Sequence, residues 1–482
     1  MLGWDGRVAG TEVEWPTTWE GARAEVERRR SVYRQAPYTD AEVVRWNLFR
    51  AVDDSNAVTA TTRRVDKLIT YVCGVDAAAI ATDGLTVEAR TAGGTSAVDP
   101  IEAADTEDAR LVWSRSGVSR QVAAWALAYC VDGDAVWEVQ LRPDGARIVW
   151  HDVRDVQVWR DLDGSISMAR IGFDYVPAPD PEDLLGDATP PERRHYVRVL
   201  TRTEVITQDG DSPPVRVPHS LGVVPLVRAR YGEIPGAVVV GAWAGLGLEA
   251  SVAMLDSATC QIQTVGTRHS NPLLKIIGAR LAEGSDPSVV GAAVSLPIGG
   301  DVAWVEAALE GVRALVEARA SLRESVERMC PELLFVDAGA SASGTALSYR
   351  ASAFSAKMLP IRESFYAALA DATAMAMAWQ SDTDARVASE ARRLIGTGAI
   401  VVSGGSVLPS DSAAEVALLT SLVESAGITR TDYIAGLQRL GMLSTDDPAA
   451  YGEQASADSD AQAARGALAA ERMGAALAGL GA

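Results

Sequence analysis

One stretch constrains the fold of this 482-residue chain more than any other: residues 337–365, which read DAGASASGTALSYRASAFSAKMLPIRESF. Its first eight residues are Gly, Ala, Ser and one Asp, and an amphipathic pattern follows from Thr345 without a break. Glycine tolerates backbone conformations closed to other residues, so these eight residues predict a supple loop. Upstream, residues 305–330 carry another charged amphipathic pattern, closed by Pro331. A helix, a small-residue loop and a second helix in this order indicate a mobile loop that projects from a rigid body and has a mechanical role.

The helix predicted at residues 305–330 carries opposite charges four residues apart. Such pairs face one another on a helix and stabilise it by roughly 0.2–0.5 kcal/mol each. They indicate either a solvated face or charge matching between neighbouring subunits. The pairs are Arg313/Glu317, Arg323/Glu327 and Glu324/Arg328.

The composition is that of a globular protein with a strong acidic excess. Apolar residues make up 48% of the chain and charged residues 22%, a balance that supports a sizeable core, and the length allows two to four domains. The net charge of −20 argues against a sequence-reading nucleic-acid binder, because such proteins gather phosphates on a basic face. It does not argue against a protein past which DNA must slide.

Motifs for catalysis, metal binding and nucleotide binding are missing from the sequence. Its four Cys and four His residues lack metal-ligand spacing, so we expect buried reduced thiols, no metal and no cofactor. No GxGxxG, P-loop or GxSxG pattern occurs in a fitting context. Asp152 and Asp155 lie near His151, where acidic turn residues explain them best. We therefore expect no catalytic residues and no enzyme.

Targeting and membrane patterns are also missing. The first residues, MLGWDGRVAGTEVEW, do not read as a signal peptide, because Asp5 and Arg7 interrupt any apolar run. The most apolar stretch, residues 237–248, is too short to span a bilayer. We expect a soluble protein without a membrane partner.

The first half of the chain predicts helices followed by a β-rich region. Helices are expected at residues 17–36, after Pro16, at 40–52, capped by Thr39 or Asp40, and at 107–129. From residue 134 to 225 apolar residues alternate, and Asp-Gly pairs mark tight turns between strands.

The second half predicts helices around a short insert. Apolar residues recur every three or four positions from Ala242, which fits either a heptad-like seam or a plain buried helix. Residues 268–300 contain two candidate strands, NPLLKIIG and VSLPIGGDV. Toward the C-terminus we expect a strand in GAIVVSG and helices at residues 412–425 and 429–440.

Three passages, in this order and spacing, resemble the portal proteins of tailed bacteriophages, the siphophage type in particular. The first, residues 125–159, is a helix running into GDAVWEV, an Asp-Gly hairpin and HDVRDVQVWRD. The second, residues 219–228, reads HSLGVVPLVR and is similar to the strand that precedes the first stem helix of portals. The third, residues 343–347, reads SGTAL and is similar to the start of the portal channel helix.

The resemblance covers nearly the whole chain and implies an α+β portal-like fold. Its parts would be a mixed α/β wing with a β-rich region at 134–228, a first stem helix, a small α/β clip, a second stem helix, a tunnel loop, a channel helix kinked at Pro360, and a helical crown with a C-terminal tail. In that order they would occupy residues 1–235, 236–267, 268–304, 305–335, 336–344, 345–381 and 382–482.

The family further implies a role and partners. A portal is a ring, commonly of twelve subunits, at one capsid vertex, assembled in the host cytoplasm and retained in the virion. Double-stranded DNA passes through it without sequence recognition, driven in by the terminase large subunit and later ejected. Its other partners are a head–tail adaptor and the major capsid or scaffolding protein.

Candidate site residues follow from this resemblance. The tunnel loop would consist of Asp337, Ala338, Gly339, Ala340, Ser341, Ala342, Ser343 and Gly344. Candidate DNA or intersubunit cations are Arg268, Lys275, Arg280, Arg350 and Lys357. The loop carries a single charge, Asp337, which departs from a loop that grips phosphates with lysine.

Two alternatives remain at this point. One is another ring-forming capsid or adaptor component without a DNA channel, which leaves the paired long helices unexplained. The other is an α/β enzyme with an unrecognised active site around His151.

Overall fold

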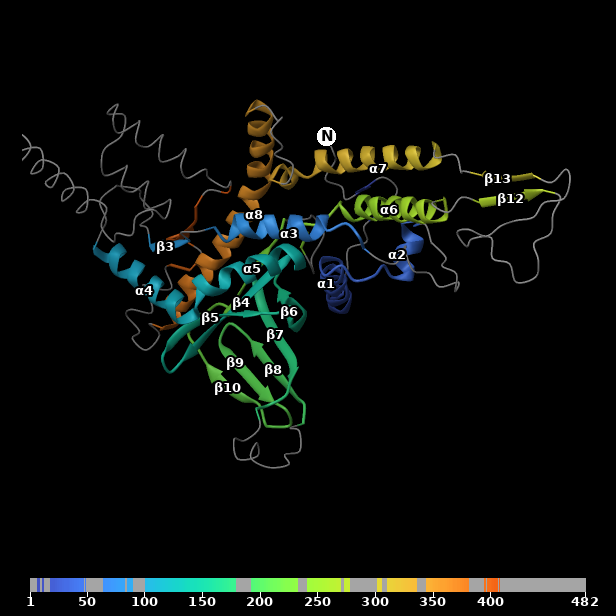
Figure 1. Cartoon of the computed structure of the whole chain (residues 1–482). Helices are drawn as coiled ribbons and strands as arrows, with labels where there is room; N and C mark the ends of the chain where they lie inside the picture. Colours follow the sequence, from blue (N-terminus) through green and yellow to red (C-terminus); the bar gives the residue numbers. More distant parts are fainter. Residues whose placement is uncertain are drawn as a thin grey trace, which may run out of the picture.

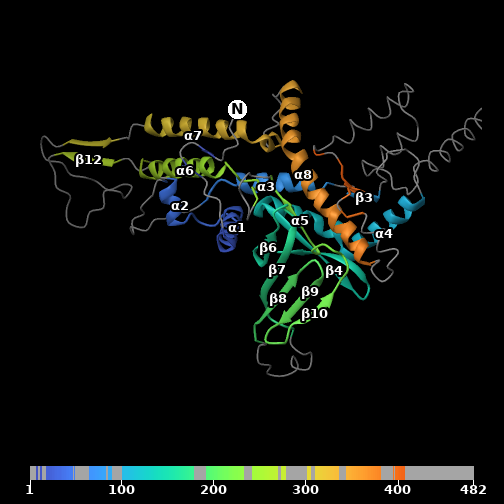
Figure 2. The same cartoon turned by 180° about the vertical axis from the view of Figure 1, so that it is seen from behind.

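The computed structural model describes residues 7–8, 11–12, 18–46, 48, 64–82, 85–89, 100–178, 192–232, 241–269, 273–277, 301–305, 310–335, 344–380, 394–395, 397–405 and 407. Helices and antiparallel sheets make a mixed α+β fold. Figures 1 and 2 show three parts: a β-rich body, a pair of long helices extending to one side, and a steep helix, α8, beside the body.

The β-rich body consists of strands, as the alternating pattern predicted, and the structure arranges them in two antiparallel sheets. The three-stranded sheet has the order β11-β4-β5 and the five-stranded sheet the order β10-β9-β8-β7-β6. Gly145, at φ +115°, begins β5 directly after the turn from β4, as expected for the Asp-Gly hairpin. The strands are β4 (Asp134–Arg142), β5 (Gly145–His151), β6 (Val156–Arg160), β7 (Ile166–Tyr175), β8 (Arg194–Leu200), β9 (Glu204–Asp209), β10 (Val215–Pro218) and β11 (Leu226–Arg230).

The first two helices begin at threonine caps, and for the second helix Thr39 is one of the two caps that the sequence predicted. In α1 (Trp19–Tyr33), the Thr18 side chain accepts a hydrogen bond from the Gly21 amide. In α2 (Asp40–Arg45), Thr39 and Glu42 form a capping box. The prediction that this second helix reaches residue 52 was wrong, because its C-cap is Trp46.

The single helix predicted at residues 107–129 was also wrong. Two helices, α4 (Pro100–Ser116) and α5 (Val118–Asp132), meet at Gly117, which has φ +64°. A left-handed residue interrupts the helical hydrogen-bond ladder, and glycine adopts it at little cost. The apolar spacing continues across the break, so periodicity alone did not locate it. Before α4 lie helix α3 (Leu68–Ile80) and strand β3 (Thr86–Ala89).

The second half of the chain follows the predicted order. Helix α6 (Glu249–His269) begins later than the predicted residue 242, after turns over residues 244–248 that include Gly247 at φ +81°. Two short strands, β12 (Leu273–Ile277) and β13 (Asp301–Val305), pair antiparallel and lead into α7 (Glu310–Met329). Next come a 3-10 turn, η3 (Pro331–Phe335), helix α8 (Gly344–Gln380) and strand β14 (Ile400–Ser403), which pairs with β3. A small β1–β2 pair (Arg7–Val8, Thr11–Glu12) lies near the N-terminus. The helices predicted at residues 412–425 and 429–440 lie outside the described residues.

The core lies where α5, β4 and α8 meet. Trp137 of β4 is fully buried and contacts Trp125 of α5 and Phe365 of α8 at ring-centroid distances of 6.1 and 5.1 Å. Helix α8 changes direction along its length in both views (Figures 1 and 2), and Pro360 inside it removes one backbone donor. Buried side chains occur in α8 from Phe354 to Trp379, so the C-terminal part of this helix is the part held in the core.

Candidate functional site

Helices α6 and α7 form a paired arm with the β12–β13 hairpin at its far end (Figures 1 and 2). They lie side by side, and the Arg319 Nε of α7 donates to the Thr259 hydroxyl of α6 at 2.8 Å. Apolar side chains of α6, such as Val252 and Leu255, are buried. On α7, Arg323–Glu327 and Arg328–Glu324 form ion pairs of 2.7 and 2.5 Å. These pairs are largely exposed, as the solvated-face reading expected.

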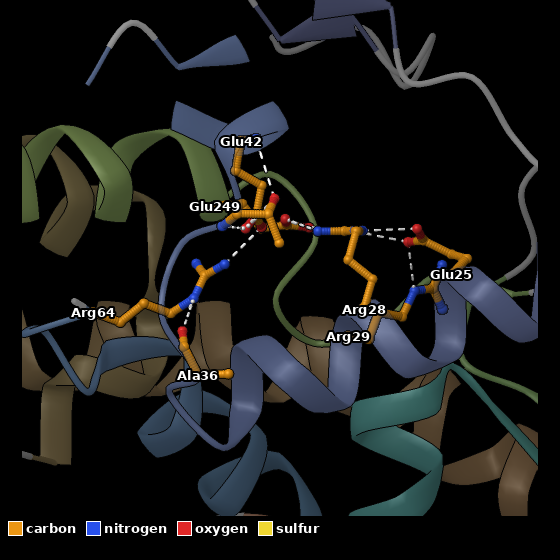
Figure 3. A network of polar contacts seen from close by, with 8 residues as sticks. Glu25, Arg28, Arg29, Ala36, Glu42, Arg64 and Glu249 are labelled. Atoms are coloured by element: carbon orange, nitrogen blue, oxygen red, sulfur yellow. Dashed lines mark hydrogen bonds and ion pairs between the residues drawn. The ribbon is translucent and has the colours of Figure 1, made fainter. Parts of the chain in front are cut away.

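The base of this arm is fixed to α1 by charge. Glu249, the first residue of α6, accepts hydrogen bonds from Arg28, one of them 2.9 Å long, and Arg28 also bonds Glu25 on its own helix (Figure 3). Burial by itself would lower the pKa of Arg28, but the hydrogen bonds to Glu25 and Glu249 outweigh it and raise that pKa. The guanidinium thus stays charged between two carboxylates from different helices.

A second contact fixes α6 about two turns further on. The buried carboxylate of Asp256 accepts hydrogen bonds from the Tyr38 hydroxyl at 2.7 Å and from the amides of Val65 and Asp66 at 3.2 and 2.8 Å. Arg64 lies over the Tyr38 ring and bonds Glu42 and the Ala36 carbonyl (Figure 3). Tyr38, just before α2, and the backbone of residues 65–66 therefore anchor α6, which α1 also anchors.

Three consecutive arginines of α1 reach three different parts of the chain. Beside Arg28, the fully buried Arg29 donates to the Asp132 and Gly241 carbonyls at 2.6 and 2.9 Å. Arg30 bonds the carboxylates of Asp132 and Asp152, at 2.8 and 2.7 Å. Sequence reasoning missed this role and treated the run only as part of a charged helix. Adjacent helical residues point about 100° apart, so three charges in a row cannot share one solvated face. This geometry was the available indication that the arginines contact other parts of the chain.

The structure explains why Gly133 and Asp134 occur together in residues 125–159, the first passage that resembles portal proteins. It has φ +87°, and a Cβ there would collide with the Ala242 carbonyl oxygen and the Arg29 guanidinium. The next residue, Asp134, is fully buried and accepts from the Gly241 amide at 3.0 Å and from Arg228 at 2.8 Å. The junction of α5 and β4 therefore receives the backbone that leads into α6, and only glycine fits there.

In residues 219–228, the second passage that resembles portal proteins, His219 lies against α8. The His219 ring lies 5.2 Å from the Trp379 ring, and the His219 amide donates to the Thr203 carbonyl at 2.8 Å. Gly222, at φ +73°, turns the chain before the buried Val224 and the start of β11. The passage thus connects the five-stranded sheet to the three-stranded sheet.

Most predicted site residues fall outside the residues, or the side chains, that the structure describes. Residues 337–343 and Arg280 lie outside the described residues, and Gly344 is the first residue of α8. Arg268 is in α6, Lys275 in β12 and Arg350 in α8, but their side chains are not described.

Lys357 is the predicted cation that the structure places fully. Its ammonium contacts Asp76 of α3 at 3.0 Å and Glu332 of η3, both carboxylates of its own chain. These intramolecular partners account for the charge of Lys357 without DNA. Tyr231, just after β11, donates to the same Asp76 oxygen at 2.6 Å.

The surroundings of His151 consist of ion pairs between the sheets. His151 Nε2 lies 2.9 Å from an oxygen of Glu138, which is fully buried and also pairs with Arg198. Burial would raise the pKa of Asp152, but hydrogen bonds from Arg154 and Arg30 outweigh it and hold that pKa well below its usual value. The contacts of Glu138 join β4, β5 and β8, and those of Asp152 join η1 (Val153–Asp155) to α1, so each set has a structural explanation.

Membrane spans and clusters of metal ligands are absent from the described residues. Within them no helix has both the length and the apolar surface needed to cross a bilayer. In the same part of the chain no three His, Cys, Asp or Glu side chains lie together as metal ligands would. All four cysteines are buried, as the sequence predicted.

Comparison with known proteins gives distant likenesses among solved structures and no match among sequences. No family model matches the chain, and no curated protein sequence matches it. Among solved structures it is similar to a chain of "Neck of empty GTA particle computed with C6 symmetry", at 12% identity and a TM-score of 0.41, over 85% of this chain and 95% of that one. A TM-score this low has no weight for function.

Proposed function

We propose that this protein is a portal-type head–tail connector: a ring at one capsid vertex through which double-stranded DNA enters and leaves. The observation that supports this most is the paired arm of α6 and α7, closed by a small β hairpin and followed by η3 and the long, bent α8. This is the succession of stem, clip, stem and channel helix that the sequence resemblance implies.

The charge of the chain fits passage of DNA better than binding of DNA. A net charge of −20 in every subunit would make a ring very acidic, and an acidic ring does not hold a duplex by counterion release. Local cations would then touch DNA only briefly. Because Lys357 has carboxylate partners within its chain, Arg268, Lys275, Arg280 and Arg350 remain the candidates for such contacts.

The proposed partners follow from this role. They are further copies of the chain in a ring of about twelve, the terminase large subunit, a head–tail adaptor, and the major capsid or scaffolding protein. The protein would be made in the host cytoplasm and end in the virion. We propose no catalytic activity of its own, since the ion pairs around His151 serve the fold.

Ring formation tests the first half of the proposal. Purified protein should sediment as a closed oligomer and appear in electron micrographs as rings with a central hole. Persistent monomers at all salt and protein concentrations would contradict it.

The DNA channel needs a separate test, because a ring without a channel would pass the first one. A photoactivatable cross-linker on Ser341→Cys should label DNA in packaged particles. The same reagent on Leu162→Cys, at an exposed turn of the five-stranded sheet, is the matched control. The native thiols are buried and should not react. Packaged particles in which neither position labels DNA would favour a ring component without a channel.

A further inference from the structure

The four-residue group around Asp76 has more negative than positive charge. It comprises Asp76, Glu332, Lys357 and Tyr231, contributed by α3, η3, α8 and the residue after β11. Asp76 is fully buried and Glu332 nearly so, while the Lys357 side chain is 30% exposed. One ammonium thus faces two carboxylates. We call this group the Asp76 cluster.

The Asp76 carboxylate is incompletely satisfied. Its Oδ2 accepts hydrogen bonds from Tyr231 at 2.6 Å and Lys357 at 3.0 Å, whereas its buried Oδ1 has no hydrogen-bond partner. Burying a carboxylate without enough partners disfavours its ionised form. A proton on Asp76 removes the surplus negative charge.

The titratable neighbours leave Asp76 as the group of the cluster that titrates near neutral pH. Burial raises the pKa of each tyrosine and thiol around the cluster, so these groups stay neutral there. They are Tyr33 of α1, Tyr71 and Cys73 of α3, Cys130 of α5, Cys330 before η3, and Tyr231. For Asp76, burial outweighs Lys357 and raises the pKa to about 7.

The cluster lies where α8 leaves the core. Buried residues of α8 begin at Phe354 and Met358, on either side of Lys357, and continue toward the sheets. The opposite, N-terminal end of α8 rises away from the body in both views (Figures 1 and 2). Glu332 fixes this point of α8 to η3, and Asp76 fixes it to α3.

We propose that the Asp76 cluster is a proton-dependent switch that sets how firmly α8, at the point where it leaves the core, is held against η3 and α3. With one proton bound, the cluster is electrically balanced and the contact is closed. When the proton leaves, the surplus buried charge favours opening. This inference concerns the single chain and does not depend on ring assembly or on DNA.

The direction of the pH effect follows from linkage. The pKa of Asp76 in the closed state lies above its value of 3.8 in an open, solvated state. The closed state therefore binds the proton more tightly, and its advantage is lost as the pH rises from about 4 through about 7. Between pH 6 and pH 8, opening should become about tenfold more favourable.

Hydrogen exchange on the full-length protein tests the switch. Amides of residues 345–356 are followed at pH 6 and pH 8, with rates corrected for the intrinsic pH dependence of exchange. Wild type should show about tenfold more opening at pH 8, and Asp76→Asn, which cannot ionise, should lose this difference. Asp371→Asn is the matched control, because burial also raises the pKa of this α8 carboxyl outside the cluster. It should keep the wild-type difference.

A second variant, Lys357→Met, and an infrared measurement keep the proposal testable if Asp76→Asn folds poorly. Lys357→Met removes the ammonium, so the pH at which exchange changes should move upward. At pH 6, infrared spectra should contain a protonated buried carboxyl band that Asp76→Asn lacks. A wild type with less than a twofold difference in opening, or a full difference retained in Asp76→Asn, would overturn the proposal. So would an unchanged transition in Lys357→Met.

Discussion

Arg28 of α1 and Glu249, the first residue of α6, are 221 positions apart in sequence and form a hydrogen-bonded ion pair at the base of the α6–α7 arm. Glu249 is only 13% exposed, and Arg28 also bonds Glu25. Because the pair is partly withdrawn from water and its partner helices come from opposite halves of the chain, it fixes the direction in which the arm leaves the body. The coupling free energy between the two side chains can be measured.

A double-mutant cycle on Arg28→Ala and Glu249→Ala should give a coupling free energy of about 1.5–3 kcal/mol, typical of hydrogen bonds between charged groups. The measurement is the midpoint of denaturant unfolding. The control cycle is Arg323→Ala with Glu327→Ala on α7, whose side chains are 47% and 32% exposed. That exposed pair should give about 0.3–0.5 kcal/mol. Equal couplings in the two cycles would contradict the anchoring role of Arg28.

Gly133→Ala should destabilise the protein by roughly 3 kcal/mol or more, because the new methyl group meets the Ala242 carbonyl and the Arg29 guanidinium. Gly164→Ala is the matched control. Gly164 has a similar φ of +84° but open space around it, so only the conformational cost of about 1 kcal/mol should appear. Thermal unfolding of both variants measures the difference. If Gly133→Ala were as mild as Gly164→Ala, the close approach would not be what requires glycine.

Thr373→Val should destabilise the contact between α4 and α8. The Trp113 indole N–H donates to the Thr373 hydroxyl at 2.9 Å, and both residues are buried. Removing the acceptor leaves a buried donor unpaired, at a cost of about 1–3 kcal/mol. Thr373→Ser keeps the hydroxyl and should recover most of the loss, as measured by denaturant unfolding. A serine variant as unstable as the valine variant would assign the effect to packing.

Local patterns predicted most of the elements, and contacts between distant residues escaped them. Alternation and Asp-Gly turns located the strands of the β-rich region, and the pair of possible caps, Thr39 or Asp40, located the start of α2. The break at Gly117 was missed because helical spacing of apolar residues continues across it. Periodicity describes one segment at a time and carries no information on which segments meet.

The candidate site was predicted only in outline for the same reason. The order of the paired helices, hairpin and long helix was readable, but their anchors were not. Asp76 and Lys357 are 281 positions apart, and Lys357 had been assigned to DNA or to a neighbouring subunit. A lysine in a helical pattern looks the same whether it faces DNA, another subunit or a buried carboxylate. Only the folded arrangement distinguishes these surroundings.

The most direct test of the central claim is a cryo-electron microscopy reconstruction of the assembled protein. A portal-type connector should form a ring in which the α6–α7 arms of all copies surround a central hole wide enough for a duplex. Residues 337–344 should face that hole. A ring in which residues 337–344 lie against their own subunit, away from the hole, would contradict it.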